Sequence, residues 1–309
     1  MASDIKKSRF EKKFRSSGLI GPLAPMLSVL PVALSILVLT IAPAMFTVYL
    51  TFTDYNGIWE KTSFIWFHNY KNIFTSLRYD VGNSLINTGR YALMVIVPVQ
   101  VLALGSALLV NAKIKGKNFF RALFFMPSIL GVVVVCAIWK MLFNPLQGPF
   151  ALLLESLKLP GSAFLGDPDI SLTLISLIAL WANFGFSMAI YLAGLQGISS
   201  EYYEAARVDG ARFMRILFKI TLPLLWPTVT ICLWIALSGC LGMSEYIIFL
   251  TDGAHNTSTM AFYIYKITMD PTIMQNQGQV ATIGLMYSMI TALILLLFNK
   301  FIRSKEVAM

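Results

Sequence analysis

The sequence predicts an all-α integral membrane protein with six transmembrane helices. Of its 309 residues, 57% are hydrophobic and 13% are charged, and the mean hydropathy is +0.71. Soluble domains carry about 25% charged residues. Six apolar runs are long enough to cross roughly 30 Å of hydrocarbon, and they leave no room for a soluble catalytic domain. These runs cover residues 26–53, 83–111, 119–143, 172–196, 221–250 and 278–302.

Basic residues are concentrated on every second segment outside these apolar runs. Most of the 24 lysines and arginines fall within 6–15, 113–121, 207–219 and 300–305, whereas acidic residues gather on the other loops. By the positive-inside rule the basic segments are cytoplasmic, so both termini are expected inside. The net charge of +9 is therefore a topology signal, and we expect no nucleic-acid partner.

This topology predicts a cytoplasmic basic tail over 1–25, a membrane domain over 26–302 and a cytoplasmic tail over 303–309. The first apolar run is too long for the core of a cleavable signal peptide. Three cysteines lie within apolar runs, where they are typical of small core residues rather than of a disulfide or a metal site. They are Cys136, Cys232 and Cys240.

The first outer loop, residues 54–82, is rich in aromatic residues. A short helix lying on the membrane surface accounts for this pattern, because Trp and Tyr are common interfacial anchors. A docking surface for an external partner accounts for it equally well. The second outer loop, 144–169, carries prolines and glycines that exclude a long helix.

A short amphipathic helix is expected between the fourth and fifth apolar runs. Ser200 is placed to cap its start, and Glu201 suits the positive end of the helix dipole. Glu204 and Arg207 can pair at i,i+3. Gly210 permits a left-handed turn that ends the helix.

Around this helix the residue types suit contact with another protein. Ala205 and Ala206 leave a shallow surface, Asp209 continues the helical repeat, and a second, basic helix is expected over 212–219. The alternative is an ordinary solvated loop helix.

The chain resembles the permease subunits of ATP-binding-cassette importers at this segment. Their signature is Glu-Ala-Ala, three residues, Gly, nine residues, Ile, one residue, Leu-Pro. The chain meets it at every fixed position, with Glu204, Ala205, Ala206, Gly210, Ile220, Leu222 and Pro223. The resemblance implies that the loop 199–220 docks on an ATPase, with Arg207 and Asp209 inside the docking helix.

Similarity to carbohydrate permeases extends over roughly residues 20–303. Asn69-Tyr70 and Asn83 with Asn87-Thr88 look like their first loop and second helix. The end of the chain resembles the MalF-like subunit of a pair. The segment after Leu250-Thr251 departs from the family pattern Leu-Thr-Gly-Gly-Gly-Pro at Asp252, Ala254 and His255. The third-helix pattern is met by Gly116, Phe119, Phe120, Arg121, Phe125, Pro127, Trp139, Phe143 and Gly148.

The resemblance also implies the partners. No Gly-x-x-x-x-Gly-Lys-Ser/Thr motif occurs, so the chain is expected to be no enzyme and to hold no cofactor, with ATP and Mg bound by a partner ATPase. The implied assembly contains a second, MalG-like permease, two ATP-binding subunits and an external solute-binding protein. It carries a carbohydrate across the bacterial cytoplasmic (inner) membrane.

Two other functions stay open. An ion-coupled secondary transporter needs ionisable groups near the bilayer centre, but Arg90, Lys140 and Glu245 lie toward the outer ends of their spans. An importer permease for a non-sugar solute would share every motif above. A membrane-embedded hydrolase would need paired acids or several histidines within the spans, and the sequence has no such group. A channel would not explain the docking helix.

Polar residues at helical spacing predict a solute pathway beside the fourth and fifth spans. Amide, hydroxyl and aromatic groups together suit sugars. The alternative is that Ser and Gly, including Gly194 and Gly242, let helices approach closely, and Gln100 is expected to make an interhelical hydrogen bond. A weaker stripe follows Gln279, Ile283 and Tyr287. The pathway candidates are Asn183, Ser187, Tyr191, Trp234, Ser238 and Glu245.

Overall fold

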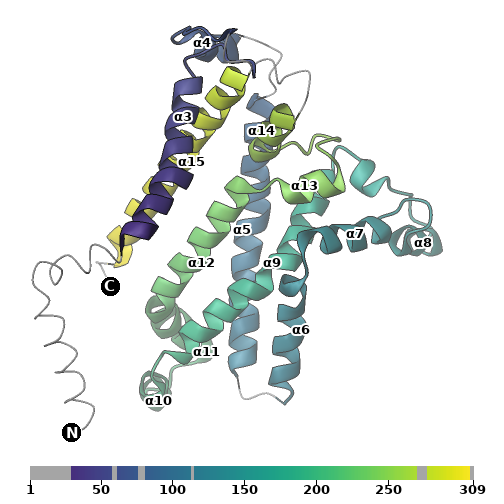
Figure 1. Cartoon of the computed structure of the whole chain (residues 1–309). Helices are drawn as coiled ribbons and strands as arrows, with labels where there is room; N and C mark the ends of the chain where they lie inside the picture. The colour runs from purple at the N-terminus through teal and green to yellow at the C-terminus, as the bar shows by residue number, and fades with distance from the viewer. Residues whose placement is uncertain (1–28, 58–60, 76–80, 113–114, 270–276, 307–309) are drawn as a thin grey trace, which may run out of the picture. The chain divides into compact units, whose positions relative to one another are not determined.

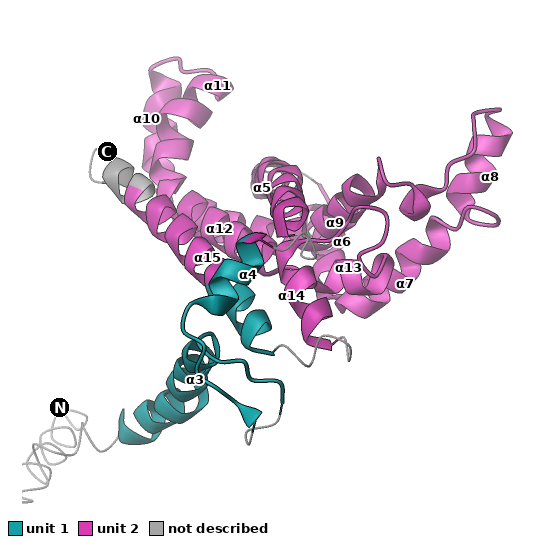
Figure 2. Ribbon diagram, turned by 90° about the horizontal axis from the view of Figure 1, so that it is seen from above, with its two compact units in different colours: residues 1–74, 275–285 teal, residues 75–274, 286–309 magenta. Residues whose placement is uncertain are grey.

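The computed structural model describes residues 29–57, 61–75, 81–112, 115–269 and 277–306, and these segments are mostly helical (Figure 1). They form two units (Figure 2), one from residues 1–74 and 275–285 and the other from 75–274 and 286–309. The expected basic tail over 1–25 lies outside the described residues. Within the described residues, five helices are long and apolar enough to span a membrane, or six if one bent pair is counted as a single span.

The first unit contains the first apolar helix, Val29–Leu50. A π-helical turn, Leu37–Ile41, precedes α3 (Ala42–Leu50), and the Ala42 N–H donates to the Leu37 carbonyl. Pro43 explains this turn, because proline has no N–H and its ring crowds the carbonyl four residues earlier. None of the most apolar window of this helix is buried, so its surface is left for lipid or another subunit.

Asn69 holds the outer end of the first unit together. It belongs to α4 (His68–Thr75), and its Nδ2 donates to the carbonyls of Thr51 and Thr53 at 2.9 and 2.8 Å. These carbonyls follow the end of α3. At the start of α15 (Gln277–Glu306), Gly278 packs so closely on the Thr53 carbonyl that a Cβ would collide with it. The Asn69-Tyr70 pattern is thus a structural clamp. Aromatic side chains around it stay exposed, which agrees with either expectation for this loop.

Helix α9 (Ser171–Gln196) is the centre of the second unit, and α5 (Val81–Asn111), α6 (Lys117–Ile129) and α12 (Leu222–Gly242) pack on it. Two glycines of α9 allow the close crossings. A Cβ at Gly185 would collide with the Phe124 carbonyl of α6, and one at Gly194 with Thr228 of α12. This is the role expected of small residues between transmembrane helices.

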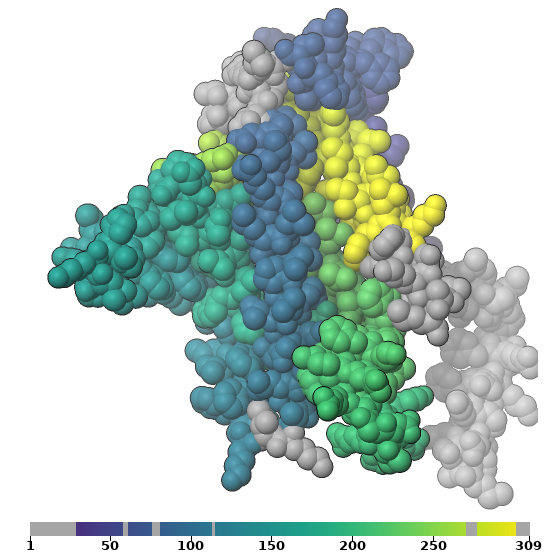
Figure 3. Space-filling model, turned by 180° about the vertical axis from the view of Figure 1, so that it is seen from behind, coloured from purple at the N-terminus to yellow at the C-terminus, as the bar shows by residue number. Residues whose placement is uncertain are grey.

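One face of α5 lies open along its length, as Figure 3 shows in blue. Most of the exposed side chains at this spacing are apolar, namely Ile86, Leu93, Val97 and Val101, and the charged Arg90 is exposed among them. A helix face of this kind suits lipid tails or a neighbouring subunit rather than water.

The third predicted span is not one straight helix. α6 ends at Ile129, and α7 (Val132–Leu142) leaves it at an angle of 98°. Leu130 and Gly131 between them are extended, with ψ of 134° and 145°. Pro127 lacks an N–H donor and Gly131 favours no helix, so the sequence weakens helical hydrogen bonding at this point. The second outer loop continues with α8 (Pro149–Ser156) and a 3-10 turn, Phe164–Gly166, which confirms that no long helix forms there.

The fifth span is displaced from its predicted range of 221–250. One continuous helix runs from Phe213 to Gly242, and Met243 is extended. A separate short helix, α13 (Glu245–Leu250), follows. Neither this break nor α14 (Met260–Met269), in the loop that follows α13, was predicted from the sequence.

Candidate functional site

The predicted docking helix is α10 (Ser200–Val208). Its N-cap is Ser199, whose hydroxyl accepts from the Glu201 N–H at 3.4 Å, so the prediction that Ser200 caps the helix is wrong by one residue. Ser199 takes the cap because its backbone is extended, with φ −60° and ψ 138°, whereas Ser200 is already helical.

Gly210 ends α10 as the sequence predicts. Its φ is +72°, and its N–H donates to the Arg207 carbonyl at 3.0 Å. The next N–H, of Ala211, reaches back to the Ala206 carbonyl at 2.9 Å. These two bonds form a Schellman motif, which needs a left-handed residue at this position.

The side chains of α10 divide between an outer and an inner face. Glu204, Ala205 and Asp209 are exposed, whereas Ala206 is only 8% exposed. Ala206 therefore packs within its own chain, and Ala205 alone offers the shallow alanine surface. Glu204 and Arg207 are both exposed, and in the described part of the chain no ion pair joins them.

The basic segment after α10 belongs to the fifth span rather than to a separate helix. It begins as α11 (Phe213–Ile216), continues through a π-helical turn, Leu217–Thr221, and joins α12 at Leu222. Pro223 is the second residue of α12, so it relates to this turn as Pro43 does to the first one. Leu222 and Pro223 are half-buried, which gives the end of the signature a structural role.

A cavity of about 690 Å³ lies beside α10, and we call it the Arg207 cavity. Arg207 and Tyr203 of α10 line it together with Asn111 at the end of α5. Arg207 is thus placed between the exposed helix surface and the ends of the spans.

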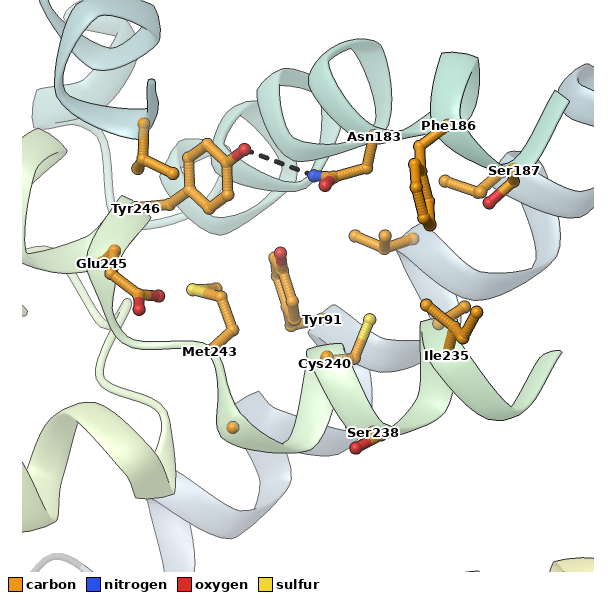
Figure 4. Close-up of a pocket in the computed structure, with 16 residues that line it drawn as sticks. Tyr91, Asn183, Phe186, Ser187, Ile235, Ser238, Cys240, Met243, Glu245 and Tyr246 are labelled. Atoms are coloured by element: carbon orange, nitrogen blue, oxygen red, sulfur yellow. Dashed lines mark hydrogen bonds between the residues drawn. The ribbon is translucent and has the colours of Figure 1, made fainter. Parts of the chain in front are cut away.

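A second cavity, of about 440 Å³, opens between α9 and α12, and we call it the α9–α12 cavity. Four of the six predicted pathway residues line it: Asn183, Ser187, Ser238 and Glu245 (Figure 4). The Asn183 Nδ2 donates to the Ala179 carbonyl at 2.7 Å and to the Tyr246 hydroxyl at 3.2 Å. Its amide oxygen stays available as an acceptor for a ligand.

Several other lining residues, among them three aromatic and two sulfur-containing side chains, were not predicted as pathway residues. Tyr91 comes from α5, Phe186 from α9 and Cys240 from α12, while Met243 and Tyr246 flank the break before α13. Their contribution depends on how distant segments pack. Phe186 precedes Ser187 in the chain, but helical spacing places it outside the predicted stripe.

Two of the predicted pathway residues, Tyr191 and Trp234, do not line the α9–α12 cavity. Tyr191 is buried and donates to Gln100 Oε1, while Gln100 Nε2 donates to the Cys232 carbonyl at 3.2 Å. These bonds join α5, α9 and α12, so the interhelical role expected of Gln100 is confirmed and Tyr191 shares it. Trp234 is 41% exposed and does not line the cavity. Helical spacing alone did not reveal which neighbouring helix each of these side chains meets.

The weak stripe of the sixth span does not line the α9–α12 cavity. Ile283 and Tyr287 are buried, and the Tyr287 hydroxyl donates to the Leu241 carbonyl. Gln279 lines a small cleft of the first unit instead. All three cysteines are buried free thiols.

A polar latch connects the third outer loop to the wall of the α9–α12 cavity. Asn87 Nδ2 donates to the carbonyls of Asn256 and Ser258 at 2.9 and 3.2 Å. Thr88 Oγ1 accepts from the Met260 N–H at 2.9 Å. The hydroxyl of Thr259 then donates to the carbonyl of Met243 at 3.0 Å. The Asn87-Thr88 pattern therefore fixes the loop that follows α13.

Long apolar helices, an exposed capped helix between two of them and a cavity with a few polar side chains within the bundle are features of a multi-pass membrane transport component. Residues 100–305 match the family described as "Binding-protein-dependent transport system inner membrane component". The match covers about two thirds of the chain, so the chain belongs to this family, and the resemblance to importer permeases is confirmed.

Individual relatives agree with this family. The multiple sugar-binding transport system permease protein MsmF of Streptococcus mutans is 33% identical over 216 residues, which cover 68% of this chain and 72% of MsmF. The probable starch degradation products transport system permease protein AmyD of Thermoanaerobacterium thermosulfurigenes is 29% identical, over 75% of this chain and 78% of AmyD.

The fold also agrees with a solved structure. One chain of a bacterial alginate ABC transporter, crystallised with an alginate pentasaccharide-bound periplasmic protein, superposes with a TM-score of 0.80. The alignment covers 93% of this chain and 98% of that chain at 22% identity. At this identity the likeness establishes the helical architecture.

Proposed function

We propose that the chain is the permease subunit of an ATP-driven importer that passes a carbohydrate from an external solute-binding protein to the cytoplasm. The α9–α12 cavity carries this proposal. Its amide, hydroxyl and aromatic side chains can hydrogen-bond sugar hydroxyls and pack on the apolar sugar faces. The names of the relatives MsmF and AmyD, which refer to sugars and starch products, support the same solute class.

In this proposal α10 docks on an ATP-binding subunit. Glu204, Ala205, Asp209 and the Gly210 turn form the exposed docking surface, while Ala206, Leu222 and Pro223 fix its shape and Arg207 faces the Arg207 cavity. ATP and Mg are bound by the ATPase. The exposed apolar surfaces of the first helix and of α5 suit contact with lipid and with a second, MalG-like permease.

The proposed orientation places both termini and α10 in the cytoplasm. Four candidate residues, Asn183, Ser187, Ser238 and Glu245, then line the passage nearer the outer side. Weak binding favours transport here, because a tightly held solute would not be released.

Reconstitution tests this function directly. The two permeases, the ATPase and the binding protein are placed in proteoliposomes, and uptake of labelled neutral oligosaccharides is measured with ATP inside. The control contains an ATPase subunit that cannot hydrolyse ATP. We expect uptake only with the active ATPase and the binding protein. Uptake driven by an ion gradient without ATP would contradict the proposal and favour a secondary transporter.

A further inference from the structure

We propose that Glu245 makes the α9–α12 cavity selective against anionic solutes. The solute is then a neutral or cationic saccharide rather than one that bears uronate, sulfate or phosphate groups. This inference rests on the proposed function, because it assumes that the solute crosses through this cavity.

The position of Glu245 follows from the break in the fifth span. Met243 is extended and ends α12, and Glu245 is the first residue of α13. The break turns α13 so that Glu245 and Tyr246 both line the cavity. Figure 4 draws the Glu245 carboxylate on the same side of the cavity as Met243, directed toward Tyr91. The latch from Thr259 to the Met243 carbonyl holds this break in place.

The α9–α12 cavity is lined by a negative charge without a positive charge beside it in the described part of the lining. Among the described residues that line it, Glu245 is the only one with a charge, and no lysine or arginine is present. The remaining polar groups are neutral hydroxyl and amide groups, and most of the wall is apolar. Lys140, on the neighbouring α7, lines a different cavity, with Asp252 and His255.

A lone carboxylate in such a cavity repels an anion. Glu245 is exposed on the cavity wall, so solvent screens part of its charge. For effective dielectric constants between about 20 and 80, two like charges roughly 7 Å apart lower occupancy by roughly threefold to fiftyfold. A neutral sugar avoids this penalty and can donate hydroxyl hydrogen bonds to the carboxylate.

Glu245 could have a purely structural role, and the fold alone could set the charge of the solute; both possibilities differ from the proposed selectivity. A glutamate in the first turn of a helix also stabilises that helix through its dipole, and that role alone would give no selectivity. The structurally similar alginate transporter imports an acidic polysaccharide, so this fold does not by itself determine the charge of the solute.

Charged thiol reagents test the proposal without knowledge of the solute. Ser238→Cys is placed in a permease with the Cys136→Ala, Cys232→Ala and Cys240→Ala changes, and the assembled importer is reconstituted. Labelling rates are measured with a sulfonate-bearing and a trimethylammonium-bearing methanethiosulfonate. We expect Glu245→Gln to raise the anionic-to-cationic rate ratio about fivefold or more. Glu245→Asp and Glu155→Gln, an exposed glutamate outside the cavity, should leave the ratio within about twofold of the parent.

ATP-dependent uptake of neutral oligosaccharides is measured in parallel on the same preparations. An unchanged labelling ratio with intact ATP-dependent uptake overturns the charge selectivity alone. If the anionic-to-cationic labelling ratio changes but the importer moves no carbohydrate, the charge selectivity of the cavity is supported and the proposed carbohydrate transport is overturned. Binding-protein-stimulated ATP hydrolysis shows that the Glu245→Gln importer is assembled.

Discussion

The loop helix α10 and the α9–α12 cavity are held in different ways. α10 is shaped by its own neighbours in sequence, namely the Ser199 cap, the Gly210 turn and one buried alanine. The cavity is shaped by contacts between distant segments, such as Asn183 with Tyr246 and Thr259 with Met243. A helix that makes few contacts with its own chain is free to contact another. The two regions should therefore fail in different ways when they are changed.

The largest effect is expected from Gly210→Val. The φ of +72° is strongly disfavoured for a β-branched residue, so the Schellman turn would reorganise and misplace α10. Uptake should fall at least about tenfold, because the strain of roughly 1–2 kcal/mol falls on the docking surface. Space is not the cause, since a Cβ at this position would meet no atom within 4 Å.

Gly210→Asn is the matched control, because asparagine tolerates the left-handed region. It should retain most of the uptake and of the ATPase association. Equal loss in both variants would show that the backbone conformation is not what matters at this position.

Glu204→Lys should have the next largest effect. It reverses a charge on the exposed face of α10 without changing any buried contact. We expect ATPase co-purification and uptake to fall about fivefold, which corresponds to roughly 1 kcal/mol of lost association. Glu201→Lys reverses a charge one turn earlier and serves as the control. A larger loss from Glu201→Lys would place the docking surface elsewhere.

Asn183→Ala and Trp234→Ala separate the cavity from the rest of the predicted stripes. Asn183 lines the cavity, and its loss removes a hydrogen bond of about 1 kcal/mol. Uptake should fall several-fold while ATPase association stays normal. Trp234 does not line the cavity, so Trp234→Ala should change uptake less than about twofold. The reverse order would mean that the solute follows the exposed face of α12.

The smallest effect on transport is expected from Tyr191→Phe. This change removes the hydroxyl that donates to Gln100 but keeps the buried ring. Thermal unfolding of the purified complex should show a loss of about 1 kcal/mol. Uptake at a permissive temperature should stay close to the parent value. Strongly reduced uptake in a stable protein would return Tyr191 to the solute pathway.

The sequence predicted α10 better than it predicted the α9–α12 cavity. The cap, the pair of alanines and the Gly210 turn depend on residues close in sequence, so spacing alone placed α10 within one residue of its observed start. The apolar runs predicted the spans for the same reason. The bend after Ile129 and the break at Met243 were missed, because both depend on extended residues inside apolar stretches that look continuous in hydropathy.

The cavity was predicted only in part, for a physical reason. Helical spacing places Asn183 and Ser187 on one face but does not say which helix that face meets. Tyr191 continues the same stripe, yet it packs against α5 and α12 because α9 is covered over much of its surface. Tyr91 and Tyr246 enter the cavity from segments that are distant in sequence, and only the packing brings them together.

We propose that α10 couples the permease to an ATPase, whereas the solute crosses the membrane through the α9–α12 cavity. The most direct test measures ATPase co-purification and oligosaccharide uptake side by side for Glu204→Lys and Asn183→Ala in the reconstituted importer. We expect Glu204→Lys to lower both quantities and Asn183→Ala to lower uptake alone. Loss of ATPase association in Asn183→Ala, or its full retention together with normal uptake in Glu204→Lys, would contradict the division of roles between the two regions.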